Sequence, residues 1–245
     1  MRKIVSVCTI AFLVVCGLSS AGMAAKIGHH LRGNPADHEN STSEVMLGMD
    51  LSKNVFSDGE TYEIDFDIIG SGVKSVKKVT IKTPKGKKMD LKNTLGLNDM
   101  RFEAGNMSYE DYQKNFPEGK YSIMLSPKAF GSETFDVTHD FPVTPVITSP
   151  VEGATDVPLT FTIEWESLAD EDIDGLFLDI EDEAGEEFEK FLTADETSFT
   201  IPADMLQANT QYEIGLAAYK NINDVMYIAT FRVINITTAA EVLVE

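Results

Sequence analysis

The chain has 245 residues, with 40 Asp and Glu against 20 Lys and Arg, so its formal net charge at neutral pH is −20. A surface this acidic repels nucleic acid and anionic lipid, and neither is an expected partner. The two cysteines, Cys8 and Cys16, lie in the first 16 residues. The rest of the chain therefore has no thiol for a disulfide, a thiolate metal site or a cysteine nucleophile.

The first 25 residues have the three parts of a secretory signal: a basic start, an apolar run from Ile4 to Val15, and small residues up to Ala25. We expect cleavage near Ala24 or Ala25 and a secreted or periplasmic mature chain. A lipoprotein signal with Cys16 as the lipidated residue is the alternative, although Val15 stands where a small residue is usual. No apolar run reaches the ~20 residues of a transmembrane helix.

Charge divides the rest of the chain into two halves. Residues 46–142 carry 13 Lys and Arg against 15 Asp and Glu, whereas residues 143–245 carry 3 against 22. Each half has about 100 residues, which is enough for a core without disulfides. We therefore expect a signal peptide at 1–25, a flexible leader at 26–45, and two domains at 46–142 and 143–245.

The leader has few apolar residues and several Gly, Pro, Asn and Ser clusters, which is typical of a chain without regular structure. It also holds three of the four histidines and two neighbouring acids, namely His29, His30, His38, Asp37 and Glu39. Imidazole and carboxylate are transition-metal ligands, but this spacing enforces no geometry, so we interpret the segment as a solvated tail.

Residues 46–142 have the pattern of strands separated by turns. Apolar and acidic residues alternate from Tyr62 to Ile68, which predicts a strand with one face in the core and one in water. The runs 76–83 and 87–91 flank Pro84-Lys85-Gly86 and predict a hairpin. Ser108 is a plausible N-cap for one short helix that ends near Phe116.

Residues 161–236 contain short alternating strands at the spacing of a β-sandwich. The lead-in Ser149–Pro158 resembles the first strand of bacterial fibronectin type III and related immunoglobulin-like modules. Trp165 matches the core tryptophan of the second strand, and Leu206 with Tyr212 matches the tyrosine corner. The resemblance covers residues 145–238 and implies a fibronectin type III-like fold with a general role in binding and no catalytic residues.

One motif is formally complete between two of these strands. The pattern D-x-D-x-D-G-x5-E of a calcium loop is matched by Asp170, Asp172, Asp174, Gly175 and Glu181. An EF-hand needs a helix on each side, whereas both flanks have the period of strands. Two interpretations stay open: a calcium site built from Asp170, Asp172, Asp174 and Glu181, and a solvated acidic loop.

Lysine is concentrated in one predicted hairpin. Eight lysines fall in residues 74–92, namely Lys74, Lys77, Lys78, Lys82, Lys85, Lys87, Lys88 and Lys92. Beside a half with a net charge of −19, this hairpin suggests electrostatic docking, either between the domains or head to tail between molecules. A solubilising face is the alternative, because exposed ion pairs are weak.

Catalytic signatures are missing: the chain has no nucleophile elbow, no glycine-rich phosphate loop, and no histidine at motif spacing from a serine. The sequence thus predicts an all-β protein of two consecutive β-sandwich domains with one short helix in the first. We expect an exported, non-enzymatic protein without a cofactor that binds a protein or polysaccharide. A calcium-dependent binding module that uses the acidic loop 170–181 is the alternative.

Overall fold

The computed structural model describes residues 29–31, 45–70, 72–96, 99–169, 171–182, 184, 187–202, 204–222 and 226–240. Strands dominate this part of the chain, and one short α-helix accompanies them, which confirms the predicted all-β class. Among these residues, no helix is long and apolar enough to cross a membrane. The predicted signal peptide with Cys16 and most of the predicted leader lie outside the described residues.

The described residues up to 142 form eight strands, one α-helix and two short 3-10 helices, and the first strand falls within the predicted leader. They are β1 (His29–Leu31), β2 (Val45–Val55), β3 (Glu60–Ile69), η2 (Val73–Ser75), β4 (Lys78–Lys82), β5 (Lys88–Lys92), β6 (Asp99–Met107), α1 (Tyr109–Asn115), β7 (Gly119–Ser126), η3 (Lys128–Phe130) and β8 (Ser132–Val137).

The second half is built from eight strands. They are β9 (Ile147–Ser149), β10 (Ala154–Val157), β11 (Thr162–Trp165), β12 (Gly175–Asp182), β13 (Glu187–Leu192), β14 (Ser198–Thr200), β15 (Gln211–Asn221) and β16 (Met226–Thr238).

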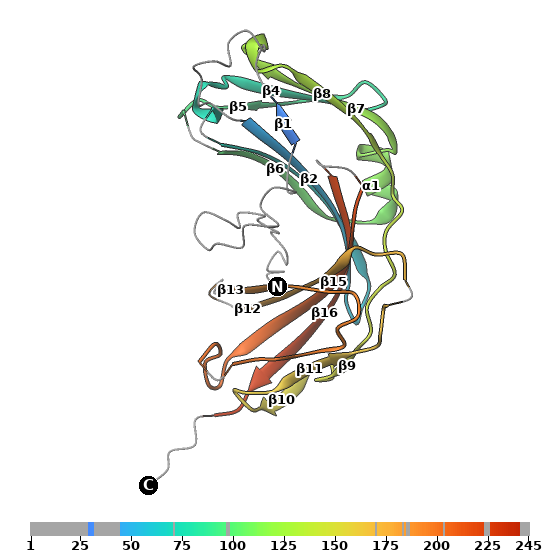
Figure 1. Ribbon diagram of the computed structural model, residues 1–245, viewed down its shortest axis with the longest axis vertical. Coiled ribbons are helices and arrows are strands. Elements are labelled where there is room, and N and C mark those ends of the chain that lie inside the picture. Colours follow the sequence, from blue (N-terminus) through green and yellow to red (C-terminus); the bar gives the residue numbers. More distant parts are fainter. Residues whose placement is uncertain are drawn as a thin grey trace.

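One continuous sheet runs through both halves, in the order β13-β12-β15-β16-β2-β3-β6. The halves join where β16 pairs in parallel with β2, so that Met226 lies opposite Met49 and Arg232 opposite Val55. From Tyr227 to Thr237, β16 also pairs antiparallel with β15. The sheet bends into a crescent, and the two smaller sheets, β5-β4-β7-β8 and β14-β11-β9, lie on its convex side (Figure 1).

Strand β16 contributes to two hydrophobic cores from a single face. Met226 and Ile228 are fully buried in the core of the first half, whereas Ile234 and Ile236 are buried in the core of the second. Side chains at every second position of a strand share a face, so both cores lie on the convex side of the continuous sheet. The predicted boundary at 142/143 falls between the strands of the two smaller sheets. Strand β16 does not respect this boundary, because its residues are buried in both cores.

The first sandwich follows the predicted pattern on its core side. Ile64, Phe66 and Ile68 of β3 are fully buried, and β4 and β5 form the predicted hairpin around Pro84–Gly86. Helix α1 begins where expected, because the Ser108 hydroxyl accepts a hydrogen bond from the backbone N–H of Asp111 at 3.2 Å.

The opposite face of β3 is buried, whereas the sequence predicted that it would be exposed to water. Glu63 and Asp65 were expected in water, yet each is only 3% exposed, so the prediction of a wet face is wrong. The reason is that β3 is an interior strand: it lies between β2 and β6, whose own acidic side chains crowd the same face.

The second sandwich packs three strands, β14-β11-β9, against β13-β12-β15-β16, which is the arrangement of a fibronectin type III fold. Trp165 lies in the core at 4% exposure and donates from Nε1 to the Glu196 carbonyl at 2.7 Å. The Tyr212 hydroxyl accepts a hydrogen bond from the backbone N–H of Gln207 at 2.8 Å. This contact is the predicted tyrosine corner.

Side chains from β15 and β16 hold the connection between the sandwiches. The Thr230 hydroxyl donates to the Pro142 carbonyl at 2.7 Å and is fully buried. Lys220 Nζ lies 3.4 Å from a carboxylate oxygen of Asp140. The connecting segment is therefore bound to the continuous sheet as well as to its own neighbours in sequence.

Candidate binding face on the concave side of the sheet

The concave face is the side of the continuous sheet that lies opposite both cores. No described helix or strand packs over its central strands (Figure 1). The cross-strand register sets which side chains meet there: Phe191, Phe177, Ala217 and Phe231 form one row across β13, β12, β15 and β16. A second row, Tyr227, Asp50, Asp65 and Glu103, crosses β16, β2, β3 and β6.

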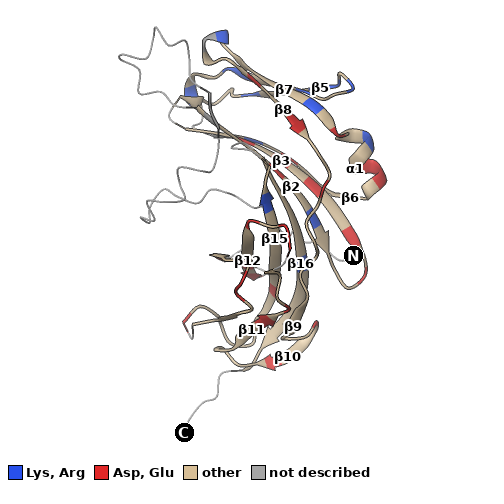
Figure 2. Cartoon of the chain, turned by 45° about the vertical axis from the view of Figure 1, so that its right-hand side comes forward, with Lys and Arg blue, Asp and Glu red and all other residues tan. Residues whose placement is uncertain are grey.

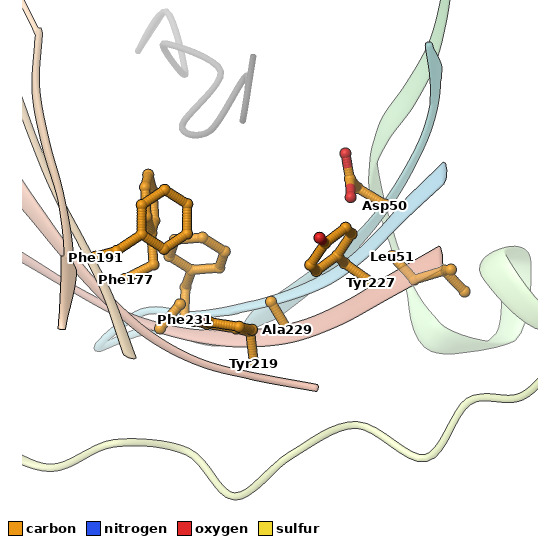
Figure 3. A pocket seen from close by; sticks show the side chains of 9 residues that line it. Asp50, Leu51, Phe177, Phe191, Tyr219, Tyr227, Ala229 and Phe231 are labelled. Carbon is orange, nitrogen blue, oxygen red and sulfur yellow. The ribbon is translucent and has the colours of Figure 1, made fainter. Parts of the chain in front are cut away.

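A pocket, which we call the aromatic hollow, lies at the centre of this face. It is lined by Asp50, Leu51, Phe177, Phe191, Ala217, Tyr219, Tyr227, Ala229 and Phe231. In Figure 3 the phenylalanine side chains stand on one side of it and Tyr227 with Asp50 on the other, with Ala229 between them. The hollow exists because β15 and β16 carry the small residues Ala217 and Ala229 at the positions where larger side chains would meet.

Five aromatic rings follow one another around the hollow. Phe231 lies against Phe177 with ring centroids 6.3 Å apart, and Phe177 lies 4.9 Å from Phe191. The series continues from Phe191 to Tyr219 at 6.0 Å and from Tyr219 to Tyr227 at 6.4 Å. The interplanar angles range from 55° to 88°, which are tilted and edge-on arrangements favoured by aromatic quadrupoles.

A first carboxylate group borders the hollow on the side of β2, β3 and β6. It consists of Asp50, Glu63, Asp65, Asp67 and Glu103. Among the described residues of these three strands, Arg101 is the one cationic residue on the concave face. Its Nη2 lies 3.6 Å from Asp65 Oδ2, and its Nε lies 3.6 Å from Asp67 Oδ1. Glu63 Oε1 and Asp65 Oδ1 are buried and have no hydrogen-bond partner among the described residues.

This crowding changes the acidity of the group. Burial raises the pKa of Glu63 to about 8, and the negative charges of Asp65 and Glu103 add to the effect. Burial likewise raises the pKa of Asp65 to about 7, against the opposing attraction of Arg101. The pKa of Asp50 is raised well above its usual range by burial and by the charges of Asp67 and Asp65. The single positive charge of Arg101 compensates these carboxylates only in part.

A second carboxylate group lies on the other side of the aromatic rings, on β12, β13 and β15. It consists of Asp179, Glu181, Glu189 and Glu213, which the register places opposite one another in pairs. Burial and the charges of Glu181 and Asp179 raise the pKa of Glu213 to about 7. The concave face thus has aromatic rings at its centre and acidic groups on both sides.

Glycines on this face make room for its larger side chains. A Cβ on Gly175 would lie 2.7 Å from the Tyr219 hydroxyl and 3.0 Å from the Leu192 carbonyl oxygen. A Cβ on Gly105 would overlap the Glu63 carboxylate. By contrast, a Cβ on Gly48 would meet Asp67 at an ordinary 3.7 Å.

The residues predicted to bind calcium do not converge in the described structure. Asp172 is fully exposed and lies 3.2 Å from Lys220 Nζ, and an Asp174 carboxylate oxygen accepts from the backbone N–H of Asn221 at 2.6 Å. Glu181 lies seven residues further along β12, roughly 23 Å from Asp174 at the rise of a strand. Among the described residues, no group of three or more ligating side chains is placed to hold a metal. Asp170 lies outside them, and the calcium site stays a prediction.

The leader histidines are divided between the described and the undescribed parts of the chain. His29 and His30 belong to β1, which pairs with Val45–Leu47 at the start of β2, a strand that the sequence did not predict within the leader. Asp37, His38 and Glu39 lie outside the described residues.

The lysine hairpin lies on the outer sheet of the first sandwich, away from the concave face (Figure 2). Lys78 and Lys92 are cross-strand partners, and so are Lys82 and Lys88. Lys78 Nζ lies 3.3 Å from an oxygen of Asp90, the acidic residue between them on β5. The hairpin therefore presents a largely basic face.

The aromatic hollow was missed by the sequence analysis, although a signal for it exists. Strand β12 contains the unbroken apolar run Leu176–Leu178, and β16 begins with the run Met226–Ala229; unbroken apolar runs indicate burial on both faces of a strand. Alternation assigned Leu176, Leu178 and Ile180 to the core correctly but left Phe177 unexplained. A second apolar face on β12 and β16 would have pointed to the hollow.

No protein-family model and no curated protein match the chain. Solved structures that match the chain include the FN1–FN3 domains of chicken CNTN1, at 14% identity over 78% of this chain and 66% of that one, with a TM-score of 0.29. A two-domain fibronectin type III segment of chicken tenascin is 12% identical over 76% of this chain and 95% of that one, with a TM-score of 0.26. The BSP domain of a biofilm-associated protein is 14% identical over 80% of this chain and 30% of that one, with a TM-score of 0.25. The strand order and the tyrosine corner of residues 147–238 are those of a fibronectin type III fold.

Proposed function

We propose that the chain is an exported, non-enzymatic binding protein that contacts a protein or polysaccharide partner through its concave face. The observation that carries this proposal is an apolar cluster on the side of the sheet that serves neither core: Phe177, Ala217, Ala229, Phe231 and Val233, with Phe56, Phe191 and Tyr219 packed against them. The cluster itself is buried, but the three rings packed against it, Phe56, Phe191 and Tyr219, are half-buried and keep part of their surface accessible. Accessible aromatic side chains bordered by charged residues are typical of an interaction site.

The residue types support binding rather than packing alone. Aromatic rings provide contact area with little loss of side-chain freedom, and they are enriched in the energetically dominant parts of interfaces. The two carboxylate groups provide polar contacts at the rim, which fix orientation and partner choice. A long concave sheet suits an extended partner, such as a polypeptide strand or a polysaccharide.

Binding is tested by probing peptide and glycan arrays with the wild type and two variants. Phe191→Ser changes a half-buried ring on strand β13, which ends the continuous sheet, and Met124→Ser changes a residue of 41% exposure on the outer sheet of the first sandwich. We expect specific binding that Phe191→Ser weakens and Met124→Ser leaves unchanged. Binding that depends on Met124 instead, or hydrolysis of a bound glycan that one carboxylate substitution abolishes, contradicts the proposal.

Export has its own test. The N-terminal signal predicts that protein secreted from a bacterial host begins near Lys26, and mass spectrometry of the intact chain measures this directly. An intact chain that starts at Met1 and remains inside the cell contradicts export without bearing on the concave face.

A further inference from the structure

We propose that copies of this chain associate head to tail, with the lysine-rich outer sheet of the first sandwich in one copy seated on the acidic outer sheet of the second sandwich in the next. The outer sheet of the first sandwich is β5-β4-β7-β8, and that of the second is β14-β11-β9. This association is independent of the concave face, because both outer sheets lie on the convex side of the continuous sheet (Figure 1).

The outer face of the first sandwich has an excess of lysine that its own residues do not neutralise. Alternation along β4 and β5 turns four lysines away from the core, namely Lys78, Lys82, Lys88 and Lys92. Asp90 is the one acidic residue of these two strands, and it pairs with Lys78 at 3.3 Å. The other three lysines are exposed and have no ion-pair partner among the described residues.

The outer face of the second sandwich carries the opposite charge. Glu164 on β11 lies opposite Ser198 of β14 and Ser149 of β9. Side chains two residues apart on a strand share a face, so Glu166 lies on the same side as Glu164, and continuation of the register sets Glu196 opposite Glu166. All three glutamates are exposed, and β9, β11 and β14 contain no lysine or arginine.

The two faces cannot meet within one molecule. The sheet that contains β5 and β7 lies at one end of the crescent, and the sheet that contains β9 and β11 lies at the other (Figures 1 and 2). Seven consecutive residue pairs between β16 and β2 join the halves, and the hydrogen bond from Thr230 to Pro142 holds the connecting segment. Of the two docking modes that the sequence suggested, only docking between molecules is compatible with this fold.

The facing charges, and not the net charge, decide this contact at physiological ionic strength. The chain has a formal net charge of −20, so two copies repel each other at long range. The Debye length is about 30 Å at about 0.01 M salt, about 8 Å at about 0.15 M and about 3 Å at about 1 M. Association should therefore be strongest near 0.15 M, where distant charges are screened and adjacent ones still attract, and weaker at both extremes.

The contact should be weak and should repeat from molecule to molecule. Short hydroxyl side chains lie between the charged residues of both faces, as in the cross-strand pairs Ser122–Thr134 and Thr162–Thr200, and they allow the sheets to approach. A few exposed ion pairs give limited affinity, so we expect a Kd on the order of 0.1 mM. Because the two faces differ, the contact is heterologous, and each copy can bind a neighbour at both ends.

The test is analytical ultracentrifugation of the chain at about 0.01, 0.15 and 1 M salt, with protein up to about 1 mM. Lys82→Glu combined with Lys88→Glu reverses two cross-strand partners and keeps a like-charge pair in the fold, and it should lower the association constant about tenfold. The control, Lys114→Glu combined with Lys190→Glu, makes the same change in net charge at exposed positions on α1 and β13 and should have less than about a twofold effect.

A charge swap identifies the acidic side of the contact. Glu164→Lys combined with Glu166→Lys should also suppress self-association, because it sets lysine against lysine. Mixing this variant with the Lys82→Glu, Lys88→Glu variant should restore association, since each then supplies the face that the other has lost. Thermal melting identifies any variant that fails to fold, and a mixture of folded variants that stays monomeric overturns the proposal.

Three further results would each contradict head-to-tail association. A wild type that stays monomeric at about 1 mM in about 0.15 M salt, or association that persists at about 1 M salt, overturns it. A monomeric protein that binds polygalacturonate, and loses this binding on Lys82→Glu with Lys88→Glu, assigns the lysine face to an anionic polysaccharide instead. Self-association that Phe191→Ser abolishes assigns the contact to the concave face.

Discussion

The two faces of the continuous sheet are made by the same strands, yet they differ in what their side chains do. On the convex face, Met226, Ile228, Ile234 and Ile236 of β16 are buried under two smaller sheets. On the concave face, Tyr227, Ala229, Phe231 and Val233 of the same strand line a surface that adjoins carboxylates. Alternation along a single strand thus divides its residues between the two cores on the convex side and a separate apolar cluster on the concave side.

Burial has different consequences on the two faces. Burying an aliphatic side chain on the convex face stabilises the fold in proportion to its apolar area. Burying Glu63 or Asp65 on the concave face opposes folding at neutral pH, because a charged carboxylate loses its hydration. A fold that retains such groups has stability to gain from any ligand that compensates them.

The largest expected effect is on the convex face. Ile228→Ala removes a fully buried side chain of the second half from the core of the first half. We expect it to lower the free energy of unfolding by about 2–5 kcal/mol and to lower the melting temperature of both halves together. Calorimetry measures this. Two separate transitions, of which only one moves, would show that β16 does not couple the sandwiches.

Next in size is Glu63→Gln on the concave face. Because the pKa of Glu63 is raised in the folded state to about 8, the stability contributed by its protonation is lost as the pH rises from about 5 to about 8. The amide stays neutral, so the variant should be more stable than the wild type at about pH 8 by roughly 1–3 kcal/mol.

The wild type and Glu63→Gln should converge at about pH 5, as chemical denaturation at several pH values can measure. Burial lowers the pKa of His139, so its protonation lowers the stability of the protein as the pH falls. This contribution is the same in the wild type and the variant, so the difference between their unfolding free energies reports on Glu63 alone. A difference that is constant with pH would show that Glu63 is not responsible.

A smaller effect is expected from Gly175→Ala, which forces the Tyr219 ring and the Leu192 carbonyl to move. We expect destabilisation of about 1–2 kcal/mol and weaker binding at the hollow, since Tyr219 is one of its walls. Gly48→Ala is the matched control, because its new methyl group has only an ordinary contact with Asp67. Equal effects of the two substitutions would argue against the close approach at Gly175.

The smallest effect in this series is that of Tyr212→Phe, which removes the hydroxyl of the tyrosine corner and leaves the Gln207 N–H without its acceptor. Loss of one such hydrogen bond should lower the free energy of unfolding by about 1 kcal/mol. The change lies in the second core, so binding at the concave face should not alter. A loss of binding would mean that the corner positions the concave residues.

Much of the convex side could be predicted from the sequence. Alternation identified the core residues of β3, β12 and β15, and local signals identified the cap at Ser108, Trp165 and the Tyr212 corner. These predictions are correct because hydrophobic periodicity, helix capping and turn formation depend on residues close together in the chain.

The concave side depends on pairing between distant segments, which the sequence does not encode locally. Parallel pairing of β16 with β2 joins residues 177 positions apart, such as Tyr227 and Asp50. It also turns β3 into an interior strand of a larger sheet, so that Glu63 and Asp65 are buried instead of wet. The hollow follows from that register and has no motif of its own.

The most direct test of the two-face account is NMR of the methyl groups of the chain, recorded with and without a ligand identified on the peptide and glycan arrays. Ala217 and Ala229 report on the concave face, while Ile64 and Ile123 report on the convex core. We predict that the signals of Ala217 and Ala229 shift on binding while those of Ile64 and Ile123 stay in place. Shifts confined to the core or to the lysine hairpin, with Ala217 and Ala229 unchanged, would contradict the assignment of binding to the concave face.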